Sequence, residues 1–283
     1  MISIIIRTKN EESNLTLLLE SVFSQSIDNE LEIVLIDSGS TDRTLDIARE
    51  YKVKVLEIPS DKFTYGYSLN YGIQNSSGDI ICSISAHCLP CNKNWLSELV
   101  KPILTGKAHA TFGKQTPKKD VNPFEELFLR QKFPESGTIS GRIPFSNANS
   151  AFLRKLWLET KFDEHITGWE DYLWYLIMKD KYIFKYVPEA EVFHSHEFSI
   201  TKMAKTAYKD GLALGYIKEK YNIGVLGDKA SLLGKVRYVF DDLITHAIFF
   251  LKKGYIGSIF MLPFVKAYMY MNYWRGYNSF YGK

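Results

Sequence analysis

Two adjacent carboxylates, Glu170 and Asp171, follow Trp169 in a stretch that predicts the start of a helix. A carboxylate that an aromatic side chain shields from water can have a raised pKa and can accept a proton from a nearby hydroxyl group. The pair could instead only stabilise the positive end of the helix that follows it. We interpret the pair as a candidate for general base chemistry.

Three histidines lie at the ends of predicted strands, namely His87, His194 and His196. A neutral imidazole can bind a metal ion, and it suits Mn²⁺ or Zn²⁺ better than Mg²⁺. A histidine by itself is more often an ordinary core or surface residue. The position of all three at strand ends favours a metal site, and the competing interpretation is that basic or neutral donors replace the metal.

Two polar turns follow predicted strands near the amino terminus. Asp37 ends one strand, and Gly39 permits a sharp turn after it. A carboxylate in this position can accept hydrogen bonds from a ribose hydroxyl or a base N–H, although a plain turn with a helix cap would look the same. The other turn contains Thr8, Asn10 and Glu11. Together the two turns indicate a nucleotide pocket.

The elements that must position these residues alternate between strands and helices. Leucines at helical spacing separate the first apolar runs, which is typical of a mostly parallel sheet with right-handed crossovers. Such a sheet binds ligands in the crevice beyond the carboxyl ends of its strands. We therefore predict an α/β fold with a mixed, mostly parallel sheet flanked by helices. The expected strands are residues 2–7, 31–36, 53–58, 79–83, 108–114, 145–152, 183–187 and 190–193.

The remaining chain predicts a loop and a helical extension. Residues 115–140 are polar and turn-rich except for an amphipathic piece at 123–128, and long loops in compact domains are usually functional. We expect this segment to be a mobile excursion over the site. Residues 1–199 are the expected catalytic domain, and residues 200–283 are an expected helical extension. One helix is expected to follow the segment 63–72 and to end at residue 74, and further helices are expected at residues 94–104, 172–179, 200–221, 232–251 and 255–271.

Charge divides the chain unevenly. The 283 residues carry a formal net charge of +3, but from residue 200 onward 13 Lys and Arg face 5 Asp and Glu. Aromatic residues and cations beside apolar helices suit a membrane interface, and contacts with the first domain or a second subunit would give the same pattern. We do not expect nucleic acid as a partner, because the basic charge is confined to this apolar tail.

The amino terminus and the cysteines predict a cytoplasmic protein. Residues 1–7 lack a basic start and a cleavage site and are typical of a strand rather than a signal peptide. Three cysteines form no even disulfide framework, so we expect reduced thiols. Cys88 and Cys91 have a two-cysteine spacing, but zinc would need two further ligands.

The order and spacing of these motifs resemble the inverting family 2 glycosyltransferases, which have the nucleotide-diphospho-sugar transferase (GT-A) fold. The resemblance covers about residues 2–200, and residues 63–70 are also similar to a segment of rhamnosyltransferase-like members. The segments that carry it are residues 4–11, 33–42, 66–72, 77–81, 147–149 and 169–171.

The resemblance implies roles for individual residues. It implies an acceptor side near Asn149 and Trp169, and it places the base on the acidic pair, where we assign the base to Asp171 and the orientation of sugar or acceptor to Glu170. The implied lining of the nucleotide pocket is Thr8, Asn10, Glu11, Asp37, Gly39, Asn70 and Ser85.

One motif departs from the family. Members normally carry Asp-x-Asp after the fourth strand, and the last Asp helps to bind a divalent metal on the diphosphate. This chain has Ser85-Ala86-His87 instead. A cation is useful there because the leaving diphosphate gains charge as the glycosidic bond breaks. We expect His87 with His194 or His196 to bind Mn²⁺ or Mg²⁺.

The expected function is transfer of a sugar, with inversion, from a nucleotide-diphosphate donor to a saccharide or lipid-linked acceptor, in cell-surface polysaccharide assembly. The alternatives are an inactive relative that binds nucleotide or glycan, and a nucleotidyltransferase on a related sheet. The altered metal motif supports the inactive relative, and the intact Glu170 and Asp171 oppose it. We expect a location in the cytoplasm or on the cytoplasmic face of a membrane, and a homo-oligomer is an open expectation.

Overall fold

The computed structural model describes residues 1–119, 121–135, 145–195, 199–223 and 232–281, with side chains omitted at 232–241 and 281. The chain divides into two compact units. The sheet unit comprises Met1–Lys119, Leu129–His165 and Glu170–Ser195. The helical unit comprises Asp120–Phe128, Ile166–Trp169 and His196–Lys283, so it also takes two short segments from earlier in the chain.

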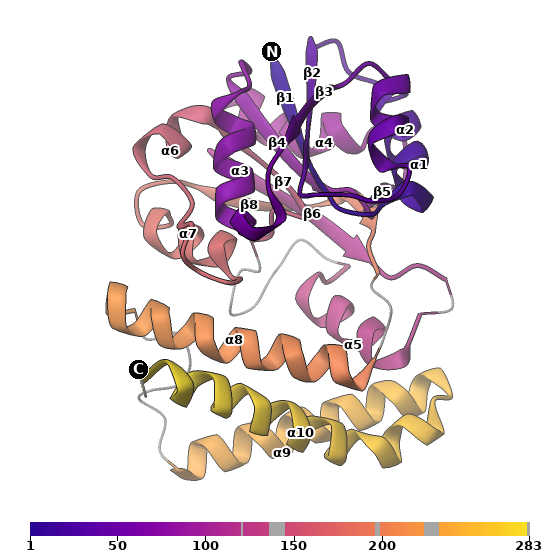
Figure 1. Cartoon of the computed structure of the whole chain (residues 1–283). Helices are drawn as coiled ribbons and strands as arrows, with labels where there is room; N and C mark the ends of the chain where they lie inside the picture. Colours follow the sequence, from indigo (N-terminus) through magenta and orange to yellow (C-terminus); the bar gives the residue numbers. More distant parts are fainter. Residues whose placement is uncertain (120, 136–144, 196–198, 224–231, 282–283) are drawn as a thin grey trace. The chain divides into compact units, whose positions relative to one another are not determined.

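The sheet unit contains one eight-stranded sheet in the order β3-β2-β1-β4-β7-β6-β8-β5 (Figure 1). The four strands β3, β2, β1 and β4 are parallel, whereas β7 runs antiparallel to both β4 and β6. This arrangement confirms the predicted mixed, mostly parallel α/β fold. The strands are β1 Ile2–Thr8, β2 Leu31–Asp37, β3 Lys54–Glu57, β4 Ile80–Ser85, β5 Leu89–Pro90, β6 Ala110–Thr116, β7 Asn149–Leu153 and β8 Phe184–Phe193.

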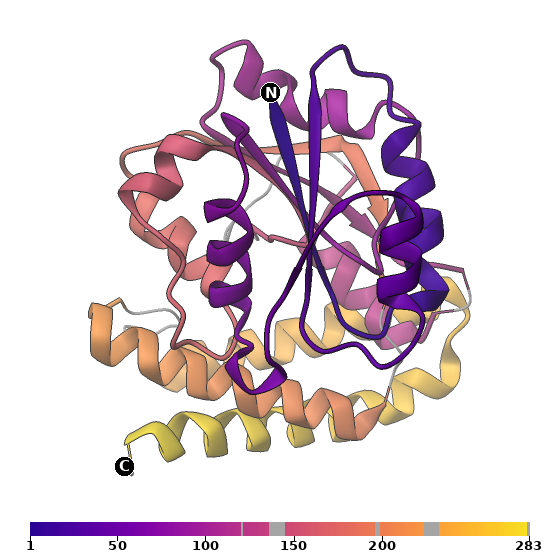
Figure 2. The same ribbon diagram turned by 45° about the horizontal axis from the view of Figure 1, so that its top comes forward.

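Helices cover both faces of this sheet (Figure 2). Ile4 and Ile6 of β1 pack with α1 (Glu12–Phe23), α2 (Thr44–Glu50) and α4 (Trp95–Leu104). Ile5 points to the opposite face, where the cluster includes residues of α3, α6 and α7. Because successive side chains of a strand point to opposite faces, a strand buried on both sides is mostly apolar, as β1 is from Ile2 to Ile6 apart from Ser3. The second set of helices is α3 Tyr65–Gln74, α6 Arg154–Glu159 and α7 Glu170–Met178.

Strand register brings several loops to one edge of the sheet. Thr8 at the end of β1 lies opposite Asp37 at the end of β2, and Arg7 lies opposite Ser85 at the end of β4. The loops that follow these three strands therefore begin next to one another. This is the edge where open parallel sheets bind ligands.

Several predicted boundaries need correction. Residues 145–148 are not a strand, because β7 begins only at Asn149. The two strands expected at 183–187 and 190–193 form the single strand β8. β6 pairs with β8 in parallel, and the register of this pairing shifts between Gly113 and Gln115. The amphipathic piece at 123–128 is part of a longer helix, α5 (Pro123–Lys132). Residues 120 and 136–144 of the expected excursion lie outside the described residues.

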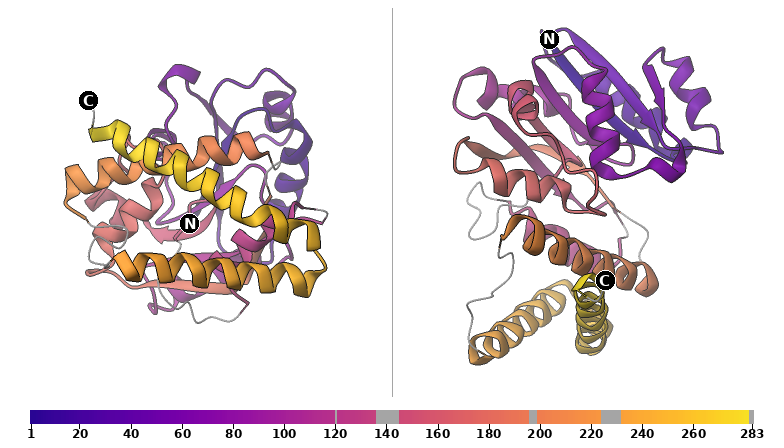
Figure 3. Two further views of the ribbon diagram at one scale, coloured as in Figure 1. Left: turned by 90° about the horizontal axis from the view of Figure 1, so that it is seen from below. Right: turned by 60° about the vertical axis from the view of Figure 1, so that its left-hand side comes forward.

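The helical unit contains α8 (Ile200–Tyr221), α9 (Leu232–Lys253) and α10 (Ile256–Tyr281), and α8 and α10 run side by side (Figure 3). Glycines make this contact close: a Cβ on Gly211 would collide with the Tyr273 carbonyl, and one on Gly276 with the Tyr208 carbonyl. α9 ends at Gly254, whose φ of +77° suits glycine at the end of a helix. No helix in the described part of the chain is long and apolar enough to cross a membrane.

Candidate active site

The loops after β1 and β2 are tied together through Asn10. Its backbone N–H donates to Ser40 Oγ at 2.8 Å, and its side-chain oxygen accepts from the Thr41 N–H at 2.8 Å. Asn10 has a φ of +54°, a left-handed conformation that asparagine tolerates better than most residues. The two turns predicted to form a nucleotide pocket are therefore in direct contact.

Asp37 organises the second of these turns from inside. One carboxylate oxygen accepts from the N–H groups of Gly39 and Ser40, each at 2.8 Å, and the other accepts from the Ser40 hydroxyl. Asp37 is buried. Because its hydrogen-bonding capacity is largely used within the loop, a contact with a ribose or base would require exchange of these bonds. Its role in nucleotide binding stays a prediction.

Gly39 brings the backbone close to a third segment. Its φ is +87°, and a Cβ there would collide with the Ser60 hydroxyl. Ser60 Oγ donates to the Ser38 carbonyl at 2.7 Å, and Lys9 Nζ donates to Ser60 Oγ at 3.3 Å. The turn needs glycine for both its conformation and this close approach.

Four side chains form a hydrogen-bonded row across the ends of several elements. Glu11 Oε1 lies 2.9 Å from His87 Nδ1, and His87 Nε2 lies 3.0 Å from His194 Nε2. His194 Nδ1 lies 2.7 Å from Gln115 Oε1. Glu11 precedes α1, His87 follows β4, Gln115 is on β6 and His194 follows β8. The fold therefore brings together two of the three histidines predicted from sequence, while His196 lies outside the described residues.

The partners of the two Nδ1 atoms determine what the Nε2 atoms can do. Burial raises the pKa of Glu11, but hydrogen bonds from His87 and Asn14 outweigh that effect, so this pKa lies below its usual value. An ionised carboxylate only accepts hydrogen bonds, and so does an amide oxygen, so both imidazoles donate through Nδ1. The hydrogen bond between the two Nε2 atoms needs one proton, which either ring can carry, so a cation could bind both atoms only after that proton leaves.

The separation of the two Nε2 atoms can be compared with that in a metal site. Two imidazole nitrogens bound to one tetrahedral Zn²⁺ at about 2.0–2.1 Å lie roughly 3.3–3.4 Å apart. The measured Nε2–Nε2 separation is 3.0 Å. A carboxylate on the other ring nitrogen of a metal-binding histidine, as Glu11 provides for His87, is a common second-shell partner. Within the described residues, however, no group of three His, Cys, Asp or Glu side chains is arranged to hold a metal ion.

The acidic pair begins α7. Glu170 is 4% exposed, and its Oε1 lies 3.6 Å from Arg7 Nη1. Burial, and then the neighbouring charge of Asp171, raise the pKa of Glu170 to about 8 against the opposing effect of Arg7. Trp169, immediately before the pair, has a φ of +66°. Such strained conformations of large residues are concentrated at functional sites.

Asp171 has a different environment from Glu170. Burial raises its pKa, but two backbone donors oppose this effect: the Asn147 N–H at 3.1 Å and the Tyr172 N–H at 2.7 Å. It is also only half buried. Hydrogen bonds to the charged form favour ionisation, so the two backbone donors offset part of the effect that burial has on the pKa of Asp171.

Unpartnered polar atoms surround this pair. Among the described residues, the buried polar atoms without a hydrogen-bond partner include Arg7 Nε and Nη1, Thr8 Oγ1 and Asn147 Nδ2. The Arg7 guanidinium also lies over the Tyr65 ring, 5.1 Å from its centroid. Buried polar groups are usually paired, so such a cluster indicates the position of a ligand. We did not assign Arg7, Asn147 or Tyr65 from sequence, although a charge at the end of the otherwise apolar β1 was a usable signal for Arg7.

Asn70 is held by hydrogen bonds within the fold. Its oxygen accepts from Trp157 Nε1 at 2.9 Å and from the Phe162 N–H at 3.1 Å. Its amide nitrogen donates to the Phe162 carbonyl at 2.9 Å and to Glu164 at 2.7 Å. The buried side chain therefore holds residues 162–164 against α3, and its predicted role in nucleotide binding stays a prediction.

Asn149 is also structural. Its oxygen accepts from Trp95 Nε1 at 2.9 Å, and its amide nitrogen donates to the carbonyls of Lys114 at 3.1 Å and Ala190 at 2.8 Å. These bonds join three strands and α4 inside the fold, so direct contact with an acceptor is not supported. Ser85, by contrast, is half buried at the end of β4. The roles predicted for Ser85 and Thr8 in nucleotide binding stay predictions.

Trp169 belongs to the helical unit, where its Nε1 donates to Asp210 of α8 at 2.8 Å. This bond fixes the indole within the helical unit. Its predicted place on the acceptor side stays a prediction.

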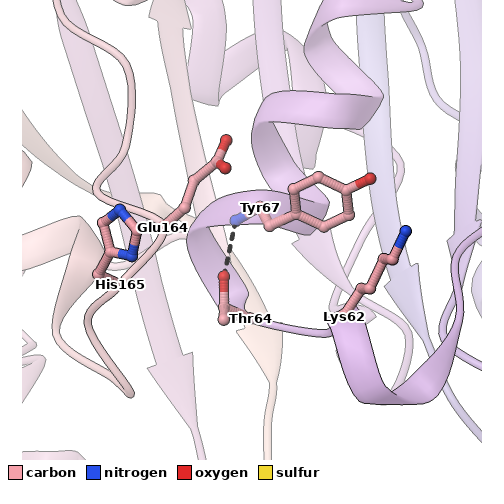
Figure 4. A pocket seen from close by; sticks show the side chains of 5 residues that line it. All are labelled: Lys62, Thr64, Tyr67, Glu164 and His165. Carbon is pink, nitrogen blue, oxygen red and sulfur yellow. Dashed lines mark hydrogen bonds between the residues drawn. The ribbon is translucent and has the colours of Figure 1, made fainter.

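A hollow of about 360 Å³ lies beside the amino-terminal end of α3 (Figure 4). Thr64 caps this helix by accepting from the Tyr67 N–H at 3.0 Å, and the next residue, Tyr65, is the one under Arg7. The hollow therefore adjoins the segment that contacts the Arg7 guanidinium. Its lining is Lys62, Thr64, Tyr67, Glu164 and His165.

Solved structures share this fold. The mannosyltransferase PcManGT from Pyrobaculum calidifontis, solved with GDP-Man and Mn²⁺, aligns with a TM-score of 0.63 at 17% identity, covering 96% of this chain and 87% of that one. Glucosyl-3-phosphoglycerate synthase from Mycobacterium tuberculosis, solved with Mn²⁺, UDP and glucosyl-3-phosphoglycerate, aligns with a TM-score of 0.60 at 20% identity, covering 80% and 82% of the two chains. These likenesses show a shared GT-A fold.

Curated proteins with similar sequences are glycosyltransferases. The O-antigen chain rhamnosyltransferase RfbN of Salmonella typhimurium is 25% identical over 212 residues, which cover 70% of this chain and 67% of RfbN. A dolichyl N-acetyl-alpha-D-glucosaminyl phosphate 3-beta-D-2,3-diacetamido-2,3-dideoxy-beta-D-glucuronosyltransferase of Methanococcus voltae is 39% identical over 95 residues, 31% of this chain and 30% of that protein. The matches therefore span about two thirds and under one third of these relatives.

A family match extends over more than half of the chain. Residues 3–160 match the family described as Glycosyl transferase family 2, which includes β1, β2, β4 and the loops that follow them. The match agrees with the motifs that first suggested this family and with the GT-A fold of the solved structures. The chain belongs to glycosyl transferase family 2.

Proposed function

We propose that this protein transfers a sugar from a nucleotide-diphosphate donor to a hydroxyl group of a saccharide or lipid-linked acceptor, with inversion at the anomeric carbon. We further propose a role in cell-surface polysaccharide assembly, which the O-antigen rhamnosyltransferase among the relatives supports. The observation that carries the proposal is the pair at the start of α7, where adjacent carboxylates have different environments. Neighbouring carboxylates whose environments affect their pKa values differently are typical of residues with different roles in acid–base chemistry.

Asp171 is the base in this proposal. Two backbone N–H groups favour its ionised form, and its side chain is more exposed than that of Glu170. As the acceptor oxygen forms its bond to the anomeric carbon, Asp171 takes the hydroxyl proton, and the bond to the nucleoside diphosphate breaks on the opposite face. This single displacement inverts the anomeric configuration.

Glu170 and Arg7 position the sugar in the proposed mechanism. A protonated Glu170 can donate a hydrogen bond to a sugar oxygen, and Arg7 has two buried N–H groups that a ligand oxygen can accept from. Asn147 Nδ2 offers another donor on the segment before β7. Ligand oxygens at these atoms would satisfy groups that are costly to leave unpaired.

The nucleotide is proposed to bind at the linked loops after β1 and β2. The direct bonds between Asn10 and the residues Ser40 and Thr41 hold these loops in one arrangement. Preorganised loops lose little conformational freedom on binding. Asp37 contributes by shaping the turn, while Gly39 allows the backbone to approach its ligand closely.

His87 and His194 are the residues proposed to hold a divalent cation, Mn²⁺ or Mg²⁺, near the diphosphate. Their facing Nε2 atoms and the carboxylate behind His87 support this assignment. The Mn²⁺ complexes of the two solved transferases with this fold also support it. A bound cation would stabilise the charge that develops on the leaving diphosphate.

An inactive protein that only binds nucleotide or glycan is the alternative. It would not need an acidic pair whose pKa values are raised by burial beside a largely buried arginine, and those features favour the enzyme. The family and fold are compatible with either.

Two measurements on the full chain test the proposal. Thermal stability with UDP, GDP and dTDP, each with and without Mn²⁺, should rise for one nucleotide, because a ligand that binds only the folded state stabilises it. The matching sugar nucleotides are then incubated with saccharide and lipid-linked acceptors. Acceptor-dependent release of nucleoside diphosphate is expected, whereas stabilisation without any release over a broad acceptor panel would favour the binding protein.

A further inference from the structure

The second helix of the hairpin α9–α10 carries an uncharged apolar face. Ile256, Phe260, Phe264 and Met271 recur at intervals of three to four residues or their multiples and lie on one side of α10. Phe260 is 73% exposed and Phe264 is 77% exposed. Residues 256–274 contain a single charged residue, Lys266, which is mostly buried. The exposed side of this stretch is therefore free of charge.

α9 carries a further row of exposed apolar residues in its described second half. Ile244, Ile248 and Leu251 are exposed and spaced four and three residues apart, so they share one side of the helix. Part of the apolar surface of α9 therefore remains exposed to solvent and does not pack within the helical unit. We call the exposed apolar side chains of α9 and α10 the hairpin face.

One ionic cluster lies between the two helices of the hairpin. Lys266 of α10 pairs with Asp242 of α9 at 2.8 Å, and His246, which is buried, lies 3.3 Å from Asp242. Burial, and then the charge of Lys266, lower the pKa of His246 to about 4. This cluster is mostly shielded from water, whereas the phenylalanines of α10 are exposed. In soluble proteins charged side chains are usually exposed and large apolar side chains are usually buried.

Cations stand beside the hairpin face. Lys252 and Lys253 are exposed at the end of α9, and Arg275 is exposed near the end of α10. α10 itself contains no Asp or Glu. From residue 200 onward the chain has 13 Lys and Arg against 5 Asp and Glu. Apolar and aromatic side chains beside cations complement the interface of an anionic bilayer.

We propose that the hairpin face docks on the surface of an anionic phospholipid membrane, with Phe260 and Phe264 inserted at the level of the headgroups. The helices lie along the surface and do not cross it, in keeping with the finding on membrane-spanning helices. A lipid interface accepts both the uncharged stripe and the flanking cations. A second copy of this chain would bring equally basic surfaces together, so charge favours the membrane.

The test is sedimentation of the full chain with vesicles of phosphatidylcholine alone or mixed with phosphatidylglycerol. Binding is expected to the mixed vesicles and to weaken as salt is raised. The variant Phe260→Ser/Phe264→Ser should lose at least about tenfold in partition coefficient, because two large apolar side chains no longer insert. Lys252→Glu should lose about fivefold or more, on mixed vesicles only.

Matched controls come from the sheet unit. Leu158 is 67% exposed and Phe23 is 55% exposed, so Leu158→Ser/Phe23→Ser removes similar exposed apolar area elsewhere. This variant should bind vesicles as the parent chain does. Circular dichroism and thermal melting of every variant separate loss of binding from loss of fold.

Trp274 provides a local readout. It is exposed on α10, so lipids brominated on their acyl chains should quench part of the tryptophan emission, and Trp274→Phe should abolish that part. The proposal is overturned if the parent chain does not bind mixed vesicles, or if the control variant loses as much binding as the phenylalanine variant. It is also overturned if Phe260→Ser/Phe264→Ser converts a dimer to a monomer without changing vesicle binding.

Discussion

The two halves of the candidate site differ in how completely their polar groups are paired. Asp37 and Asn10 both accept hydrogen bonds from the backbone of the loop after β2. Around α7, Arg7 and Asn147 have buried donors without hydrogen-bond partners among the described residues, and Glu170 has a pKa raised to about 8. The first region is held in one arrangement by its own hydrogen bonds. The second region has the unpaired donors and the shifted pKa that are typical of catalytic sites.

The same contrast explains why the two regions tolerate change differently. A side chain within the paired loops acts through the shape of the turn, so its loss weakens binding. A side chain near α7 acts through charge and proton position, so its loss should affect the rate of transfer. The substitutions below separate these outcomes.

Arg7→Met should have the largest effect of the comparison. It removes the buried cation 3.6 Å from Glu170 and both unpartnered donors while keeping an unbranched side chain. We expect transfer to fall by about 100-fold or more, since a preorganised charged donor commonly contributes that much. Steady-state kinetics should show the loss in kcat, with thermal melting as the check on folding. An unchanged kcat would show that Arg7 has no role in the transfer step.

Glu11→Gln should weaken the response to metal. Glu11 Oε1 accepts from His87 Nδ1 at 2.9 Å, and loss of such a partner typically costs about 10–100-fold in metal affinity. Titration of activity with Mn²⁺ should show a higher half-saturating concentration. Glu20→Gln, a substitution on the helix α1 that follows Glu11, serves as the control. Equal Mn²⁺ dependence in the parent and Glu11→Gln would argue against the histidine site.

Asn70→Ala should mainly lower stability. Its four hydrogen bonds join α3 to residues 162–164, and loss of a buried partner costs about 1–3 kcal/mol. Urea unfolding should show this decrease, while the Kd for nucleotide should change by less than a factor of two to three. Loss of nucleotide binding with an unchanged free energy of unfolding would instead support a direct role of Asn70 in nucleotide binding.

Glu170→Gln should change how stability depends on pH. The pKa of Glu170 is about 8 in the folded protein, above its ordinary 4.5. Between these values the folded state holds a proton that the unfolded state has released, so the free energy of unfolding of the parent falls as pH rises.

Glutamine cannot ionise, so the variant lacks that decrease. We expect Glu170→Gln to gain roughly 3–4 kcal/mol relative to the parent between pH 5 and pH 8.5, since each pH unit between the two pKa values contributes about 1.4 kcal/mol. Urea unfolding at both pH values measures the difference. Parallel pH profiles of the two proteins would show that Glu170 is not protonated in the folded state.

The sequence predicted the strands, the sheet class and the edge where the polar residues gather, because apolar runs and turn residues are local signals. Local sequence signals did not predict the direction in which each side chain points. Asn70 and Asn149 occupy motif positions, yet the packing of Trp157 and Trp95 against them turns both amides inward. That outcome depends on contacts far apart in the sequence.

The histidine pair illustrates the same limit. His87 and His194 are 107 positions apart and meet because their strands, β4 and β8, both end at this edge. Sequence could place each at a strand end, but only the register of the whole sheet sets the separation of their Nε2 atoms. Arg7 was overlooked because a charge at the end of a strand has several explanations until its neighbours are known.

Transfer by Asp171→Asn tests the central claim most directly. In this variant the amide cannot accept the hydroxyl proton, but Asn preserves the shape of the side chain and one acceptor for the backbone donors. Single-turnover transfer should fall by about 100- to 10,000-fold, the usual contribution of a general base. The Kd for the sugar nucleotide should stay within a factor of about three, and the exposed Asp180→Asn should behave as the parent. Retention of most of the transfer rate in Asp171→Asn would contradict the account.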